Sequence, residues 1–219
     1  MTMGALHVAR TGLDAQNMRM QVIANNLANV NTTGFKRDRA SFDTLAYQAI
    51  VAAGATSSGD NKYATGLNLG TGVQVGGTTR VDTQGTIATT GNALDLAVEG
   101  AGYFQVLMPD GRTGYTRAGN FTRSAEGQLV TSQGYAVLPP ITIPEGASGV
   151  TVGADGTVSV TVAGETAPTE LGQITVASFA NPAGLQALGD NYLSETAASG
   201  PAQIGVAGDA GRGSIRQGM

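Results

Sequence analysis

The sequence predicts an α+β protein, with one long N-terminal heptad helix and a mostly antiparallel β domain of short strands and hairpins. Three observations predict this fold class. Apolar residues recur at heptad spacing within the first thirty residues. Short apolar runs separated by Asp-Gly and Glu-Gly turns fill residues 81–200. Between them, a stretch rich in small residues shows no periodicity.

The N-terminal segment carries the only strong helical pattern in the chain. One face combines positions seven residues apart with intermediate positions three residues later, interrupted once by Gln16. This heptad stripe consists of Leu6, Ala9, Leu13, Met20, Ile23, Leu27 and Val30. Gly34 follows as a stop signal, so the helix should span roughly 26 residues and about 40 Å.

A helix with such a stripe usually lies on the core of its own domain. Here no second helical pattern of similar length follows in the sequence. The stripe therefore favours packing between helices of different chains, and the helix alone should gain too little from propensity to be stable in water.

Residues 46–80 are rich in Ala, Gly, Ser and Thr, and two interpretations remain open for them. Their composition is typical of a flexible linker. A structureless loop of this length inside a compact domain is unusual, however, and such loops are often functional.

Three hairpins are expected in the β-rich part, around Asp110-Gly111, Glu126-Gly127 and Asp155-Gly156. A further strand is expected at 174–179, and a turn follows at 181–185. The tail from Gly200 shows no clear element.

The residues that catalysis or metal binding would need are largely missing. Cysteine is absent and His7 is the only histidine, so a zinc site would need an unusual all-carboxylate shell, and no Ser-His-Asp set can be built. The carboxylates of Asp110, Glu126 and Asp155 are explained by their positions before turn glycines. We therefore expect no catalytic, cofactor-binding or metal site, and no cofactor.

Charge and hydropathy limit the possible partners. Residues 1–40 hold five basic and two acidic residues, whereas the rest holds seven basic and fourteen acidic ones. The basic residues are too sparse for a nucleic-acid surface. No run reaches the roughly 18 apolar residues of a membrane span, and the N-terminus lacks the pattern of a cleaved signal peptide.

The end of the predicted helix resembles the signature of the flagellar rod, hook and hook-associated proteins. The residues that carry it are Ala24, Asn25, Asn26, Leu27, Ala28, Asn29, Asn31, Thr32, Thr33, Gly34, Phe35 and Lys36. Residues 94–106 and 115–121 resemble the family's first β segments, with Tyr103 where Phe is more usual. The resemblance covers nearly the whole chain.

The resemblance implies a structural subunit that self-assembles into a helical tube, a drive shaft carrying motor torque to the hook. It implies a rod-core helix segment at 1–45, an extended inter-subunit loop at 46–80, a β-rich outer domain at 81–200, and a tail at 201–219 returning toward the rod core. Implied partners are further copies, adjacent rod and hook subunits, surrounding ring proteins and, transiently, the flagellar type III export apparatus. The implied location is the periplasm-spanning rod of the basal body.

Within the family, three segments look most like the distal rod class: 66–73, 139–144 and Gln217-Gly218. A neighbouring rod protein of similar length is the alternative. Family members continue past Gln-Gly into a C-terminal heptad helix that pairs with the N-terminal one, so we expect that partner helix to lie outside this chain, which ends at Met219.

Two other classes stay open. A secreted β-rich adhesin-type module would leave the heptad helix unexplained. An enzyme acting on polysaccharide would need a carboxylate pair in a cleft, and the acidic residues placed by the sequence lie in turns.

Overall fold

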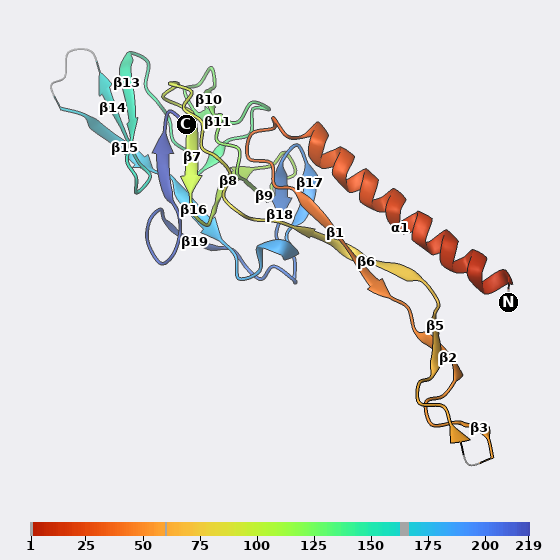
Figure 1. The fold of residues 1–219 in the computed structure, drawn as a ribbon. Coiled ribbons are helices and arrows are strands. Elements are labelled where there is room, and N and C mark those ends of the chain that lie inside the picture. The colour runs from red at the N-terminus through yellow and green to blue at the C-terminus, as the bar shows by residue number, and fades with distance from the viewer. Residues whose placement is uncertain (1, 60, 163–166) are drawn as a thin grey trace. The chain divides into compact units, whose positions relative to one another are not determined.

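The computed structural model describes residues 2–59, 61–162 and 167–219 and confirms the α+β class (Figure 1). The chain forms two compact units. The helix–hairpin unit comprises residues 1–30 and 37–81, and the β unit comprises residues 31–36 and 82–219. The chain therefore passes between the units at three points: after Val30, after Lys36 and after Val81.

The predicted helix is present as α1, Thr2–Ala28, the only α-helix in the described part of the chain. It contains no proline to interrupt it. At its end the Asn29 backbone N–H and side-chain amide both donate to the Asn25 carbonyl, at 3.1 and 2.9 Å. These bonds satisfy a carbonyl that the ending helix would otherwise leave free.

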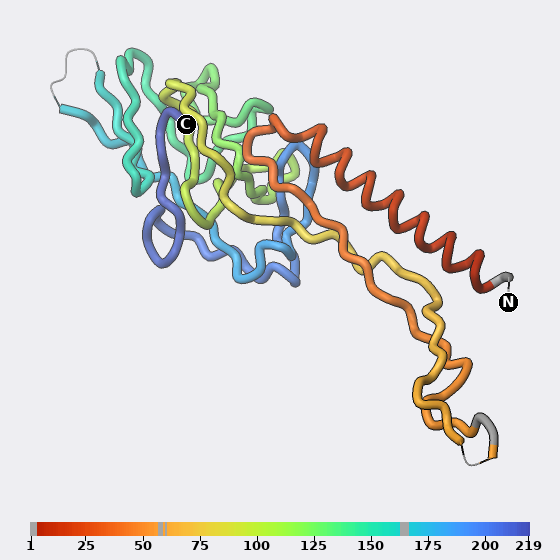
Figure 2. The backbone as a smooth tube through the Cα atoms, viewed as in Figure 1, coloured from red at the N-terminus to blue at the C-terminus, as the bar shows by residue number. Residues whose placement is uncertain are grey.

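Residues 38–59 and 61–80 form one long antiparallel hairpin, whose two limbs run side by side over most of their length (Figure 2). Its base pairs β1 with β6, its middle pairs β2 with β5, and its tip pairs β3 with β4. The strands are β1 Asp38–Thr44, β2 Tyr47–Val51, β3 Thr56–Ser58, β4 Asn61–Lys62, β5 Leu67–Gly70 and β6 Val73–Arg80. Residues 46–80 are thus largely strand rather than structureless chain.

The β unit is built around a seven-stranded sheet with the order β17-β18-β9-β8-β16-β19, in which β12 also pairs with β8. Separate small sheets join β13-β14-β15, β7 with β20, and β10 with β11. The first strands are β7 Leu96–Glu99, β8 Tyr103–Leu107, β9 Thr113–Thr116, β10 Thr122–Arg123, β11 Leu129–Val130, β12 Val137–Leu138 and β13 Ala147–Val152. The later ones are β14 Thr157–Val162, β15 Thr169–Gln173, β16 Thr175–Ser178, β17 Gln186–Gly189, β18 Tyr192–Ser194, β19 Gln203–Val206 and β20 Ser214–Gln217, with a short 3-10 helix at Pro182–Gly184.

All three predicted hairpins are confirmed. β8 pairs with β9, β10 with β11, and β13 with β14, each antiparallel and each closed at the predicted glycine turn. Gly111, Gly127 and Gly156 have φ between +81° and +89°, the left-handed region that glycine enters without steric cost.

The tail is better ordered than its sequence indicates, so the prediction of no clear element after Gly200 was wrong. β19 extends the large sheet beside β16, and β20 pairs with β7. Ile215, in β20, is only 2% exposed. One buried apolar residue in a four-residue strand leaves no alternation to detect.

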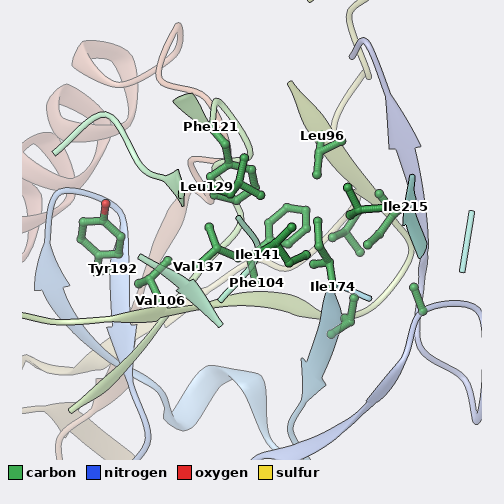
Figure 3. Close-up of a cluster of buried hydrophobic side chains, with 14 residues drawn as sticks. Leu96, Phe104, Val106, Phe121, Leu129, Val137, Ile141, Ile174, Tyr192 and Ile215 are labelled. Atoms are coloured by element: carbon green, nitrogen blue, oxygen red, sulfur yellow. The ribbon is translucent and has the colours of Figure 1, made fainter. Parts of the chain in front are cut away.

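The core of the β unit consists of two clusters, one on each face of the large sheet. Successive residues of β8 point to opposite faces and so enter different clusters. Phe104 and Val106 enter the larger cluster, where Phe104 meets Phe121 edge to face at 5.1 Å (Figure 3). Tyr103 enters the second cluster beside Phe179. The side chains labelled in Figure 3 come from distant parts of the chain, from Leu96 to Ile215.

Candidate assembly interface

The heptad stripe of α1 is an exposed apolar face. Its large members Leu6, Leu13, Met20, Ile23 and Leu27 are between 55% and 71% exposed. Ala9 is also exposed, and Val30, just past the helix end, is 69% exposed. The stripe therefore has no cover within the described part of the chain.

A different face of the same helix packs on the long hairpin. Ala15 is the one buried residue among residues 4–28 of α1, the part of the helix whose burial is described, and Met18 and Val22 are half-buried. These residues and Thr11 are spaced four, three and four apart, which places them on one side of a helix. At 100° per residue this side lies nearly opposite the stripe.

Polar contacts fix the helix to the hairpin at two places. The Asn26 side chain donates to the Asp38 carbonyl at 2.8 Å and accepts from the Asp38 N–H at 3.0 Å. Farther along, Thr11 Oγ1 accepts a long bond of 3.5 Å from the Val73 N–H. A β-carbon on Gly72 would lie 2.4 Å from that hydroxyl oxygen, so the close approach requires glycine.

The long hairpin is a second apolar surface. Tyr47, Ile50, Leu67 and Leu69, on the β2–β5 part, are each between 49% and 65% exposed. A two-stranded ribbon is marginal in water unless something packs on it. Exposed apolar residues concentrated on such a ribbon are typical of an interaction surface.

The second half of the signature, residues 31–36, lies in the β unit. Gly34 has φ +73°, and a β-carbon there would lie 2.6 Å from the Ala118 backbone nitrogen. The Thr33 carbonyl accepts from the Asn191 side chain at 2.7 Å, and Lys36 Nζ donates to the Thr83 carbonyl at 2.7 Å. The close approach to Ala118 requires a glycine at 34, and the bond to the Thr83 carbonyl requires a long donor side chain at 36.

The first half of the signature lies in the helix–hairpin unit. Asn25, Asn26 and Asn29 make the end-of-helix and hairpin contacts described above, whereas Ala24, Leu27 and Ala28 are exposed. Asn31, Thr32 and Thr33 are exposed, and Gly34, Phe35 and Lys36 are half-buried. The signature thus combines residues that hold the chain's own fold with residues left on its surface.

Burial lowers the pKa of two cationic side chains, Lys36 and Arg117. The pKa of Lys36 is lowered, first by burial and then by the nearby Arg117 guanidinium, while the Asp82 carboxylate opposes the shift. The pKa of Arg117 is lowered by burial, opposed by Tyr103 and Asp82. Its guanidinium donates to the Gly100 carbonyl at 2.6 Å and the Val98 carbonyl at 3.2 Å, and lies 5.4 Å from the centre of the Tyr103 ring.

Sequence reasoning missed the packing face of α1 and the group around Arg117. Thr11, Ala15 and Asn26 are small or polar, so hydropathy does not distinguish them from a solvated face. Their spacing alone was the available signal. The sequence gives no sign of a structural role for Arg117 beyond the resemblance of residues 115–121, because a cation in a turn is usually solvated.

The described residues also bear on metal binding and membrane insertion. No group of three or more His, Cys, Asp or Glu side chains there could hold a metal ion. No helix there combines the length and apolar character needed to cross a membrane.

Similarity to known proteins agrees with the exposed helix and the β unit. Residues 6–36 match the family described as flagella basal body rod protein, and residues 97–160 match the D1 domain of the flagellar hook protein FlgE/F/G family. The chain is 48% identical to the flagellar basal-body rod protein FlgG of Caulobacter vibrioides, covering 98% of this chain and 82% of that protein. It is 43% identical to FlgG of Borreliella burgdorferi, covering 99% and 83%.

Two further flagellar proteins are also similar to this chain. Identity to FlgG of Bacillus subtilis is 40%, covering 98% of this chain and 82% of that protein. The flagellar hook protein FlgE of Helicobacter mustelae is 42% identical over 129 residues, covering only 58% of this chain and 28% of that protein.

An exposed heptad helix, the signature loop and the D1-type β unit define an axial component of the flagellum. The chain belongs to the FlgG family of flagellar basal-body rod proteins, the structural subunits of the distal rod. This family is structural and non-enzymatic, which excludes the alternative of an enzyme acting on polysaccharide.

Proposed function

We propose that copies of this chain polymerise into a helical tube, in which the heptad stripe of each α1 is buried against other helices of the tube. The tube is the distal part of the drive shaft and carries motor torque toward the hook. Its stiffness comes from many equivalent subunit contacts made at once.

One observation carries this proposal: α1 has two distinct faces, and only one of them packs on its own chain. The stripe side chains Leu13, Met20 and Leu27 are each at least 66% exposed. Fully burying a side chain of this size stabilises an assembly by about 1.5–3 kcal/mol. Several such residues on every subunit supply a strong driving force for association.

The long hairpin is the second contact between subunits in this proposal. Its β2–β5 part carries Tyr47, Ile50, Leu67 and Leu69 on the surface. A hairpin that seats these side chains on a neighbour bridges outer parts of adjacent copies. The interpretation of residues 46–80 as a mere linker would leave this apolar surface unused.

Further partners follow from a position in the rod. Adjacent rod and hook subunits contact the ends of the tube, and ring proteins surround it. We propose export through the flagellar type III apparatus and a final location across the periplasm. The domain roles proposed from the resemblance are a helical core at 1–45, a bridge at 46–80, an outer wall at 81–200, and a tail at 201–219 returning toward the core.

The experiment replaces Leu13 and Met20 together by serine in the full-length protein in cells. Both side chains are exposed, so the melting temperature of the purified chain should stay unchanged while rods fail to assemble. The matched control is Gln21→Ser, at another exposed position of α1. Electron micrographs showing normal rods with the double variant, at normal protein level, would exclude the stripe as the assembly surface.

A further inference from the structure

Two cations and one carboxylate gather where the long hairpin leaves the β unit. Lys36 immediately precedes the first limb, and Asp82 immediately follows the second. Arg117 belongs to neither limb and follows β9. All three lie in the β unit and are half-buried.

The two ends of the hairpin run side by side at this point. Beyond the last β1–β6 pair, the Val81 N–H donates to the Arg37 carbonyl at 2.9 Å. One step farther, the Lys36 ammonium donates to the Thr83 carbonyl at 2.7 Å. A lysine side chain thus continues the pairing of the two limbs after the backbone ladder has ended.

Arg117 contacts the segment that follows the second limb, at Gln84. Its Nη1 donates to the Gln84 side chain at 3.4 Å and to the Val98 carbonyl, and its Nη2 donates to the Gly100 carbonyl. Tyr103, under the guanidinium, donates its hydroxyl to Asp82 Oδ1 at 3.4 Å. Arg117 also precedes Ala118, whose backbone the Gly34 turn approaches closely.

Asp82 is the carboxylate that balances the two cations. It interacts electrostatically with both Lys36 and Arg117, whereas these two repel each other. Among the salt bridges of the described residues, none involves Lys36 or Arg117 directly. Asp82 therefore acts on the pair through its nearby charge and through Tyr103.

We infer that Lys36, Asp82 and Arg117 form a clamp within the β unit, which holds together the two chain segments that flank the long hairpin, residues 31–36 and 82–84. The clamp joins two segments of the family motif, the loop 31–36 and the segment 115–121. It concerns the free chain and does not depend on assembly into a rod.

The test is hydrogen exchange of the full chain, read in peptides covering 31–37 and 80–86. Asp82→Asn keeps the shape of the side chain but leaves the two cations unbalanced, so exchange in both peptides should rise about five- to tenfold, as expected when a charge-assisted interaction is lost. Peptides from the core strands β8 and β16 should keep the wild-type exchange rate. Arg39→Met is the matched control: it removes an exposed cation from β1 and should change neither peptide.

A double-mutant comparison decides between a clamp and independent contacts. Lys36→Met alone loses the bond to Thr83 and should raise exchange in the same peptides. The double variant Lys36→Met/Asp82→Asn should exchange more slowly than the product of the two single effects, because removing Lys36 also removes a cation that Asp82 balances. Strictly multiplicative effects, or no change in either peptide with Asp82→Asn, would overturn the inference.

Discussion

The helix–hairpin unit and the β unit handle apolar residues in opposite ways. In the β unit Phe104, Val106, Ile174 and Val176 are fully buried. In the helix–hairpin unit the large apolar residues Leu13, Met20, Leu27, Tyr47 and Ile50 are more than half exposed. The β unit is therefore stabilised by its own core, whereas the helix–hairpin unit leaves large apolar side chains exposed in the free chain, and we propose that neighbouring copies cover them.

The largest effect should come from emptying the core of the β unit. Phe104 is 0% exposed and packs edge to face on Phe121. Phe104→Ala should lower the free energy of unfolding by about 3–5 kcal/mol, because it removes buried contacts and leaves a cavity. Urea unfolding followed by tyrosine fluorescence would measure the loss. The matched change on the other unit, Leu13→Ala, should leave that free energy nearly unchanged.

A smaller loss is expected at the signature turn. Gly34→Ala forces a β-carbon into the left-handed region and against the backbone of Ala118, at a cost of about 1–3 kcal/mol. The control is Gly12→Ala, since a β-carbon at Gly12 meets nothing within 4 Å and alanine favours helix by about 1 kcal/mol. Equal destabilisation by both changes would show that Gly34 is not constrained as described.

The helix itself should be weakly protected in the free chain. Within residues 4–28 of α1 only Ala15 is buried, so little apolar contact opposes the entropy of the unfolded segment. Backbone NMR at low concentration should show residues 6–30 with averaged shifts and fast amide exchange. Strong helical shifts there in a monomer would mean that the helix needs no neighbour.

Shortening the hairpin tests whether its tip is a bridge. Deleting residues 51–62 removes β3 and β4 and leaves most of the β2–β5 pairing. The melting temperature of the β unit should barely move, since loop-closure entropy changes slowly with length. Rods should become more flexible or change length. Rods with wild-type length and bending stiffness would identify the segment as a linker.

The smallest effect should come from the turn carboxylates. Asp110 accepts from Arg112, and Asp155 accepts from Thr157, and these bonds hold the pKa of each carboxyl below its usual value. Their stabilisation is therefore present above the usual carboxyl pKa of 3.8 and is lost as the pH falls through the lowered folded-state values. Both side chains are exposed to solvent, so this loss should be minor.

Changing Asp110, Glu126 and Asp155 together to Asn should therefore leave swimming and the neutral-pH melting temperature close to wild type, because Asn-Gly turns equally well. Loss of swimming with normal rods and normal protein level would show that these groups do more than turn the chain.

Some parts of this fold could be predicted from the sequence because they depend on residues that are close together in the chain. Heptad spacing identified α1, and the turn residues at Gly111, Gly127 and Gly156 identified three hairpins. The β2–β5 ribbon could not be found this way, since nearly all its residues are exposed and an alternating pattern needs one buried face.

The candidate assembly interface also has a part that could be predicted from the sequence and a part that could not. The exposed stripe was readable because heptad repeats are visible without a partner. The packing face of α1 and the contacts of Lys36 and Arg117 depend on segments distant in sequence, such as Val73, Thr83 and Gly100. Nothing in local composition indicates which distant backbone a side chain will meet.

The claim that the heptad stripe becomes buried between subunits is tested most directly by thiol labelling. The chain has no cysteine, so Leu13→Cys and Gln21→Cys each introduce one reactive site. Both positions are exposed in the free chain, where both should react rapidly with a maleimide. In isolated basal bodies the Leu13→Cys rate should fall by more than about tenfold, because thiol reactivity depends on exposure. Gln21→Cys should be protected less. A Leu13→Cys thiol that reacts as fast in the rod as in the free chain would contradict the account.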